Sequence, residues 1–152
     1  MNEGKLTIPG VGISRQNSMQ MLREIVGMTG EGSELTVFSY SVTDGWLRQL
    51  MKLKEEMAVK RITLVLDRDV MIRHREKLEQ IRRVADEAWL TDSHAKVYLS
   101  RGRTRTIALI TSANATNNYR TECHYGTDRP TETGQIERDI GAILEASDRI
   151  VP

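Results

Sequence analysis

The chain has 152 residues, of which 39% are hydrophobic and 28% are charged, and its formal net charge is +1. This length predicts one domain with a continuous core, and the composition is ordinary for a soluble globular protein. A charge so close to neutrality excludes a polycation, so any affinity for nucleic acid must come from a local basic patch. The single cysteine, Cys123, excludes an intrachain disulfide and argues against a cysteine metal cluster.

Two classes of segment are missing from the sequence pattern. No apolar run reaches the length of about 18 residues that a membrane-spanning helix needs. The first ten residues, MNEGKLTIPG, lack the apolar core of a signal peptide. We therefore expect a cytoplasmic protein that has no membrane partner.

The first half of the chain alternates helices and strands. Residues 1–16 are polar and contain proline and glycine, which predicts an N-terminal arm before a single domain over residues 17–152. Asn17 or Ser18 can cap a helix whose apolar positions follow the helical period: Met19, Leu22, Ile25 and Val26. Residues 35–42 predict a strand. Thr43 or Asp44 then caps a second helix with the apolar face Trp46, Leu47, Leu50, Leu53 and Met57.

The second half supplies most of the strands. The run RITLVL at 61–66 is typical of a buried parallel strand, and a helix over about residues 70–87 follows it. Further strands are predicted at residues 89–90, 95–99, 106–110 and 121–125. Thr131 or Thr133 caps a last helix with these apolar positions facing inward: Ile136, Ile140, Ile143 and Leu144. This order predicts an α/β fold, with a mixed, largely parallel sheet and helices on both faces.

Polar residues follow the same spacing at two neighbouring strands. His94 and Lys96 are two residues apart on a predicted strand, so their side chains point to one face. Ser112 and Asn114 repeat that spacing at the end of the next strand, and Glu122 follows them. An imidazole, an ammonium, a hydroxyl and an amide at one end of a sheet suit an anionic, tetrahedral group such as phosphate.

This set of residues resembles the HKD half-site of the phospholipase D superfamily, which pairs His-x-Lys with a later Asp and with Ser and Asn further on. Two positions depart from that pattern: Arg101 stands where the family has Asp, and Thr111 stands where glycine is usual before the serine. The chain most resembles the small bacterial nucleases of the superfamily, which carry one half-site per chain and are often exported. The resemblance implies a phospholipase D-like fold, a metal-independent phosphodiesterase without cofactors, and nucleic acid, chiefly DNA, as the partner.

A catalytic role for His94 requires a second imidazole. His94 can attack phosphorus to form a phosphohistidine, while another imidazole protonates the leaving oxygen and later activates water. His74 lies in a charged run typical of a solvated helix face, and His124 lies outside the motif with a supporting role at most. We therefore expect a homodimer in which each chain contributes its own His94. Glu122 would hold a histidine nitrogen, in its own chain or in the partner chain.

The remaining charged residues leave alternatives open. Arg101, Arg103 and Arg105, with Arg120, are predicted to bind backbone phosphates, although the hairpin could equally be a solvated turn. Arginine in place of the family's Asp also admits a catalytically impaired module that binds nucleic acid or phosphate on the same fold. Phospholipid hydrolysis ranks last, because no amphipathic membrane helix is visible.

Two carboxylates in a turn raise the question of a metal. Asp67 and Asp69 follow the buried strand at 61–66 and could in principle bind a cation. A strand-to-helix turn with a capping Asp explains them as well. We favour the cap, and no metal site is predicted.

Overall fold

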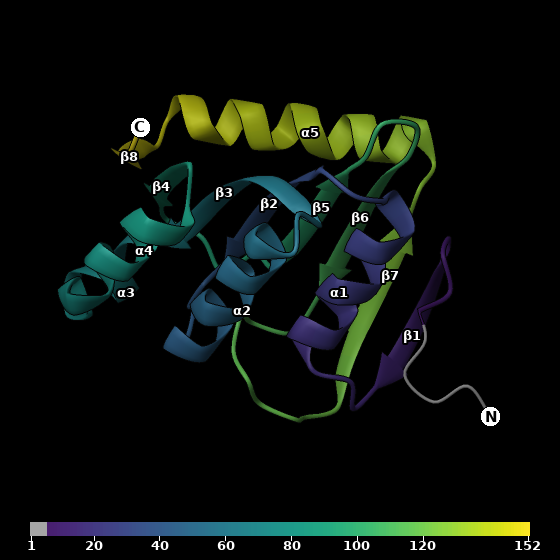
Figure 1. The fold of residues 1–152 in the computed structure, drawn as a ribbon, viewed down its shortest axis with the longest axis horizontal. Coiled ribbons are helices and arrows are strands. Elements are labelled where there is room, and N and C mark those ends of the chain that lie inside the picture. The colour runs from purple at the N-terminus through teal and green to yellow at the C-terminus, as the bar shows by residue number, and fades with distance from the viewer. Residues whose placement is uncertain (1–5) are drawn as a thin grey trace.

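One sheet organises the chain (Figure 1), and the computed structural model describes residues 6–152. Within these residues the strand order is β1-β7-β6-β5-β2-β3-β4-β8. The strands are β1 (Gly10–Ser14), β2 (Ser33–Ser39), β3 (Val59–Asp67), β4 (Glu87–Thr91), β5 (Val97–Arg101), β6 (Thr106–Thr111), β7 (Glu122–Thr127) and β8 (Asp148–Val151). The helices are α1 (Ser18–Thr29), α2 (Asp44–Glu55), α3 (Arg68–Arg73), α4 (Leu78–Val84) and α5 (Pro130–Glu145), with a short 3₁₀ turn, η1 (Arg75–Lys77).

The sheet is mixed, as the sequence predicts, and the α/β class is confirmed. Its centre is parallel, since β3 pairs in parallel with β2 on one side and with β4 on the other. The remaining pairings between the named strands are antiparallel: β1–β7, β2–β5, β4–β8, β5–β6 and β6–β7. The parallel share is therefore smaller than expected. The reason is local, because β5, β6 and β7 follow one another without a crossover helix, and only such a crossover returns the chain for parallel pairing.

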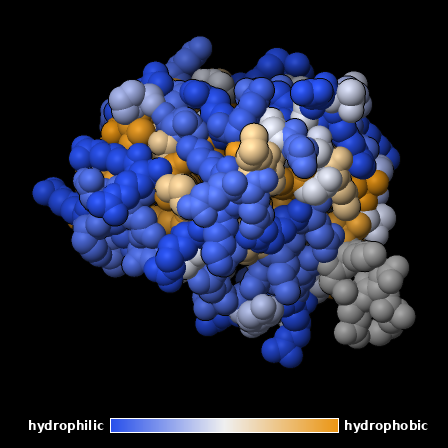
Figure 2. Space-filling view, in the orientation of Figure 1, coloured by the Kyte–Doolittle hydropathy of each residue, from blue (hydrophilic) through white to orange (hydrophobic). Residues whose placement is uncertain are grey.

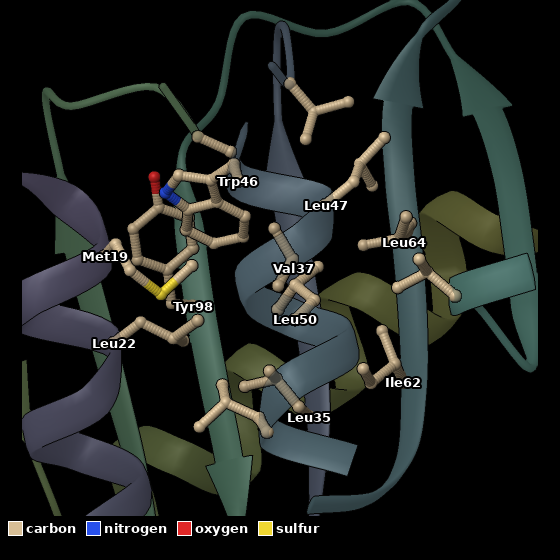
Figure 3. Close-up of a cluster of buried hydrophobic side chains, with 14 of the residues drawn as sticks. Met19, Leu22, Leu35, Val37, Trp46, Leu47, Leu50, Ile62, Leu64 and Tyr98 are labelled. Carbon is tan, nitrogen blue, oxygen red and sulfur yellow. The ribbon is translucent and has the colours of Figure 1, made fainter. Parts of the chain in front are cut away.

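The larger core lies between the sheet and the helices α1 and α2. Trp46 and Tyr98 are fully buried there, with ring centroids 5.5 Å apart. Figure 3 shows these two rings beside Met19 and Leu22 from α1, with Leu50 of α2 packed over the strand residues. The caps predicted for both helices are present, since Asn17 accepts the backbone N–H of Gln20 and Thr43 accepts that of Trp46. The apolar spacing thus gives the expected amphipathic helices, except that Met57 lies beyond the end of α2 and is 75% exposed.

Helix α5 covers the opposite face of the sheet, as Figure 3 shows behind the strands, and contacts β6 and β4. The strand residues on this face are buried: Phe38, Val65, Leu99 and Ala108. The helix begins at Pro130 with Arg129 as its N-cap, not at a threonine. Ile143 keeps 41% of its surface exposed, and the other three predicted inward residues are half-buried. The expected inward face is therefore only partly enclosed.

Several other boundaries differ from the sequence prediction. Residues 10–14 form β1, paired to β7, so this part of the expected arm belongs to the sheet, while residues 1–5 of the arm lie outside the described residues. Two glycines in β1 weaken the strand signal of Val11 and Ile13. The helix expected over 70–87 is divided into α3, η1 and α4, and strand β8 after α5 has no counterpart in the prediction.

The surface on the side shown in Figure 2 is dominated by hydrophilic residues, with small apolar areas between them. None of the helices in the described part of the chain is long and apolar enough to cross a membrane.

Candidate active site

The predicted site residues lie at one edge of the sheet, which we call the site edge. Strands β2 and β3 end there, β5 and β7 begin there, and β6 ends there. Helix α1 also begins at this edge, since the Ser18 hydroxyl donates to the carbonyl of Thr116 in the loop after β6. Helix α2 begins five residues after the end of β2, and α3 begins directly after β3. The N-termini of α1 and α2, which carry partial positive charge, therefore lie at this edge, whereas Asp67 already binds the first N–H groups of α3.

His94 lies in the segment before β5 and not on the strand itself. The strand begins at Val97, so His94 and Lys96 both precede it, and the predicted strand start at residue 95 is too early. The His94 side chain is exposed, and its ring lies against that of Tyr40 with the centroids 4.6 Å apart and the planes at 34°. Tyr40 directly follows β2. An aromatic contact of this kind restricts the orientation of the imidazole.

Asp67 positions the segment that carries His94. It is buried, and its Oδ1 accepts the backbone N–H groups of Asp69 and Val70 at the start of α3. Its other oxygen accepts the backbone N–H of Ser93, at 3.2 Å. The prediction that Asp67 is a helix cap is confirmed, and the same carboxylate also ties the residue before His94 to the end of β3.

Lys96 lies beside His94 and beside the end of β6. Its Nζ donates to the His94 carbonyl oxygen at 2.9 Å, and its own carbonyl accepts the backbone N–H of Thr111 at 3.1 Å. The backbone pairing of β5 and β6 therefore continues past the strand ends. It places the cation next to the strand that leads into Ser112.

Ser112 and Glu122 are in direct contact. The Ser112 hydroxyl donates to Glu122 Oε2 and accepts the backbone N–H of Cys123 at 3.0 Å. The described residues give Glu122 no hydrogen bond to a histidine, so within this chain its partner is the serine. The prediction that Glu122 holds a histidine nitrogen therefore concerns a histidine of a second chain.

Asn114 lies in a loop that is tied to the core at several points. Its Oδ1 is 3.5 Å from the Ser39 hydroxyl, which accepts the Ala115 backbone N–H at 3.0 Å. The buried Tyr98 hydroxyl donates to the Ala113 carbonyl at 2.6 Å. Burial raises the pKa of that phenol, so it stays a neutral donor. These bonds hold Ser112 and Asn114 on a rigid support.

The basic hairpin lies at the other end of the same strands. Strand β5 runs away from the site edge and ends at Arg101, and β6 returns from Thr106. Arg101 is paired there with Glu34 and Glu137, and Arg105 is paired with Asp128 at 3.0 Å. At about 3.3 Å per residue, the five residues of β5 place the hairpin more than ~10 Å from Lys96.

The structure therefore does not bring the predicted phosphate-binding arginines Arg101, Arg103 and Arg105 to the candidate cluster. Arg120 does lie in the loop between β6 and β7 on the site side, where it is exposed. The departure from the family's Asp at position 101 is likewise remote from His94.

The other two histidines do not join His94. His74 follows α3 and lies 3.3 Å from the carboxylate of Glu76. His124 points toward β1, where its ring lies so close to Gly12 that a Cβ there would be 2.7 Å from its Nε2. Its Nδ1 has no partner among the described residues, and burial lowers its pKa. A second imidazole for the cluster is therefore not supplied from within this chain.

Sequence reasoning missed Tyr40 and Arg73 at this edge, and it gave Asp67 a capping role without its bond to Ser93. Tyr40 contacts the His94 ring, Arg73 Nη2 donates to the Tyr40 hydroxyl at 3.2 Å, and Asp67 holds Ser93. Tyr40 follows β2, while Asp67 ends β3 and Arg73 ends the helix after it, and the carboxyl ends of these parallel strands meet at one edge. That rule is the signal that could have found them.

Comparison with known proteins finds similarity in structure alone. No protein-family model matches the chain, and no curated protein matches it. Nuc from Salmonella typhimurium, described as a phospholipase D family member, superposes with a TM-score of 0.66 at 11% identity, over 94% of this chain and 97% of that one. NucT from Helicobacter pylori gives 0.69 at 13% identity, over 93% and 100%. TrmBL2, described as an archaeal chromatin protein with a novel mode of DNA binding, gives 0.57 at 11% identity, over 96% and 56%.

Proposed function

Because this chain has the phospholipase D fold and resembles in fold the small bacterial nucleases of that superfamily, we propose that it is a metal-independent phosphodiesterase that cleaves nucleic acid, chiefly DNA. The observation that carries the proposal is the gathering of His94, Lys96, Ser112, Asn114 and Glu122 at one edge of three adjacent strands. An exposed imidazole beside a lysine suits an attack on a phosphodiester.

The first half-reaction transfers the phosphoryl group to His94. An imidazole nitrogen forms a bond to phosphorus as the bond from phosphorus to the leaving oxygen breaks, which gives a phosphohistidine. Lys96 supplies a point charge for a non-bridging oxygen, and the Asn114 amide supplies hydrogen-bond donors. Ser112 would supply a donor once its hydroxyl turns from Glu122 to the phosphate. In the second half-reaction water attacks the phosphorus and releases the histidine.

A second imidazole must donate a proton to the leaving oxygen and later take one from water. Since His74 and His124 point elsewhere, that group is His94 of a second copy related by a twofold axis. Glu122 would then orient an imidazole of the shared site. The exposure of His94 is what such sharing requires, because a buried imidazole could not meet its counterpart.

An apolar patch next to the site edge supports a second copy. Val11 and Ile13 of β1 are 77% and 76% exposed, and Ile110 of β6 is 43% exposed. Val11 and Ile110 both lie opposite Tyr125 in the register, so their side chains share one face. Adjoining exposed apolar side chains are typical of a surface that meets another chain.

The test is cleavage of single-stranded and double-stranded oligonucleotides in the presence of a chelator. We expect cleavage that resists EDTA and that is lost in His94→Ala. A base-quenched reaction is expected to show a phosphate adduct on the peptide that contains His94. A requirement for Mg²⁺, or cleavage by His94→Ala, would overturn the proposal.

Sharing of the site has its own test. Solution mass is expected to correspond to a dimer, and adding an excess of His94→Ala to the active protein is expected to reduce its activity as mixed dimers form. Ile13→Asp, which charges the apolar patch, is expected to lower both the mass and the activity together. Full activity in a monomer would contradict the shared site.

A binding module is the second candidate. The observation that favours it is the similarity in fold to TrmBL2, a protein described by its DNA binding. Such a module would bind oligonucleotides with strong salt dependence and would turn none over at any pH. Arginine at position 101 in place of the family's Asp is the sequence-based reason for this second candidate.

A further inference from the structure

Three side chains form a row at the site edge. The His94 ring packs on the Tyr40 ring at a centroid distance of 4.6 Å, and the Tyr40 hydroxyl accepts a hydrogen bond from Arg73 Nη2 at 3.2 Å. They come from three separate segments: the loop before β5, the end of β2 and the end of α3. The guanidinium of Arg73 is thus one tyrosine ring away from the candidate nucleophile.

Arg73 differs in its partners from the ion-paired arginines of this protein. Arg68 is paired with Asp92 and Asp148, and Arg105 is paired with Asp128. Within the described residues, Arg73 has no carboxylate partner and donates only to Tyr40 and, through Nε, to the Asp69 carbonyl. An exposed guanidinium held by two neutral acceptors keeps its charge and further N–H groups available for an anion.

We propose that Tyr40 is a positioning residue for His94 and that Arg73 binds a phosphate one or two nucleotides from the scissile one. This inference rests on the proposed function and deepens it, because it identifies the substrate as a strand with several phosphates. A ligand with a single phosphodiester would engage His94 and leave Arg73 without a partner.

The spacing suits a nucleic-acid strand. Phosphates follow one another at about 3.4 Å of helix axis along each strand, so a cation one aromatic ring from the nucleophile is within reach of a flanking phosphate. Arginine can bind that phosphate with two parallel hydrogen bonds, which would fix the direction of the strand across His94.

Tyr40 acts through the imidazole. Within the described residues the His94 ring has no hydrogen bond, and the Tyr40 ring is its aromatic neighbour. The tilted contact, with the two ring planes at 34°, limits the rotation of the imidazole. The hydrogen bond from Arg73 holds the tyrosine in place, so the substrate-binding cation and the nucleophile are coupled through one ring.

The experiment compares two substrates in the full-length protein. One is an oligonucleotide, and the other is bis(p-nitrophenyl) phosphate, which has a single phosphodiester. For Arg73→Gln we expect the ratio of kcat/KM on the oligonucleotide to that on the small diester to fall about tenfold, through KM. Arg73→Lys is expected to recover part of the loss. Arg75→Gln, which removes an exposed cation two residues further on, is the matched control, with a ratio within about twofold of the unmodified protein.

Tyr40 is tested by two variants. Tyr40→Leu removes the ring and is expected to lower kcat on both substrates by about tenfold, because the nucleophile loses its orientation. Tyr40→Phe keeps the ring contact and is expected to restore kcat on the small diester. Equal losses in both variants would show that the hydroxyl and not the ring matters, and would overturn the positioning role.

A separate readout keeps the two proposals distinct. If the unmodified protein turns over neither substrate, the proposed phosphodiesterase is wrong, and Arg73 is still tested by oligonucleotide binding. The slope of log K against log salt is then expected to fall by about one unit in Arg73→Gln and to stay the same in Arg75→Gln. Equal effects of the two variants, in turnover ratio or in salt slope, would overturn the role of Arg73.

Discussion

Both ends of strands β5 and β6 carry basic side chains, but they differ in ion pairing, because two of the three arginines at the hairpin end are paired with carboxylates. At the hairpin end, Arg101 lies between Glu34 and Glu137, and Arg105 contacts Asp128. At the site edge, the described residues give Lys96 and Arg73 no carboxylate partner. A paired arginine must give up its carboxylate before it can bind phosphate, whereas an unpaired cation need not. The comparison shows that a run of arginines in a sequence does not by itself locate a phosphate site.

The largest effect is expected from Lys96→Met at the site edge. If Lys96 stabilises charge that develops on phosphorus, kcat falls by about 10²–10³-fold, the usual cost of removing one such donor. The measurement is single-turnover cleavage. Arg103→Gln, which removes an exposed cation from the hairpin end, is the matched control and is expected to change kcat by less than about twofold. An equal fall of kcat in the two variants would mean that the cations at the site edge and at the hairpin end do not differ in their role in turnover.

A smaller effect, on stability, is expected from Tyr98→Phe, which removes the hydrogen bond that supports the loop at the site edge. The Ala113 carbonyl would lose a buried donor, so the free energy of unfolding should fall by about 1–3 kcal/mol. Urea denaturation measures it. Tyr119→Phe is the control, since that side chain is exposed and the expected change is within about 0.5 kcal/mol. An unchanged midpoint in Tyr98→Phe would mean that the loop is not held by this bond.

At the hairpin end, Arg101→Ala is expected to cost less than about 1 kcal/mol of stability, because both of its ion pairs are largely exposed. Turnover should stay within about twofold, since this residue is remote from His94. A double-mutant cycle with Glu137→Gln isolates the pair energy. A tenfold loss of turnover would show that position 101 acts on the site from the far end of the strand.

The smallest effect concerns pH and His124, which lies at the site edge but faces β1. Burial lowers its pKa in the folded state below the ordinary value of about 6.5. The unfolded chain therefore binds the proton more readily. The contribution of His124 to stability is present above about pH 6.5 and is lost as the pH falls through the folded-state pKa. Urea denaturation between about pH 5 and pH 8 should show this decline and a shallower one in His124→Gln. If the free energy of unfolding depends on pH equally in the two proteins, His124 does not contribute to the pH dependence of stability.

Local sequence signals predicted the parts of the fold that depend on short-range chemistry. The polar caps Asn17 and Thr43 mark where α1 and α2 begin, and the apolar spacing after them marks the buried faces. The same holds for the buried strand at 61–66 and for its capping residue Asp67. These features follow from hydrogen bonds and periodicities within a few residues, so no knowledge of distant contacts is needed.

Features that depend on distant partners could not be predicted in this way. Strand β1 contains two glycines and is recognisable only through its pairing with β7. The sequence predicts that Arg101 binds a phosphate. Because β5 runs away from the site edge, Arg101 lies at the opposite end of the sheet, where it forms an ion pair with Glu137 of α5. Strand direction and helix docking are set by the whole sheet.

By itself, the sequence determined the spacing on which the prediction of phosphate chemistry rests, that of His94, Lys96, Ser112, Asn114 and Glu122. Only the tertiary structure decided which other groups accompany them. The structure brings together residues that are far apart in the chain, since Tyr40 packs on His94 and Arg73 binds Tyr40. It also places the arginine hairpin at the end of the sheet away from His94. Such contacts arise from sheet order and strand direction, which no local pattern encodes.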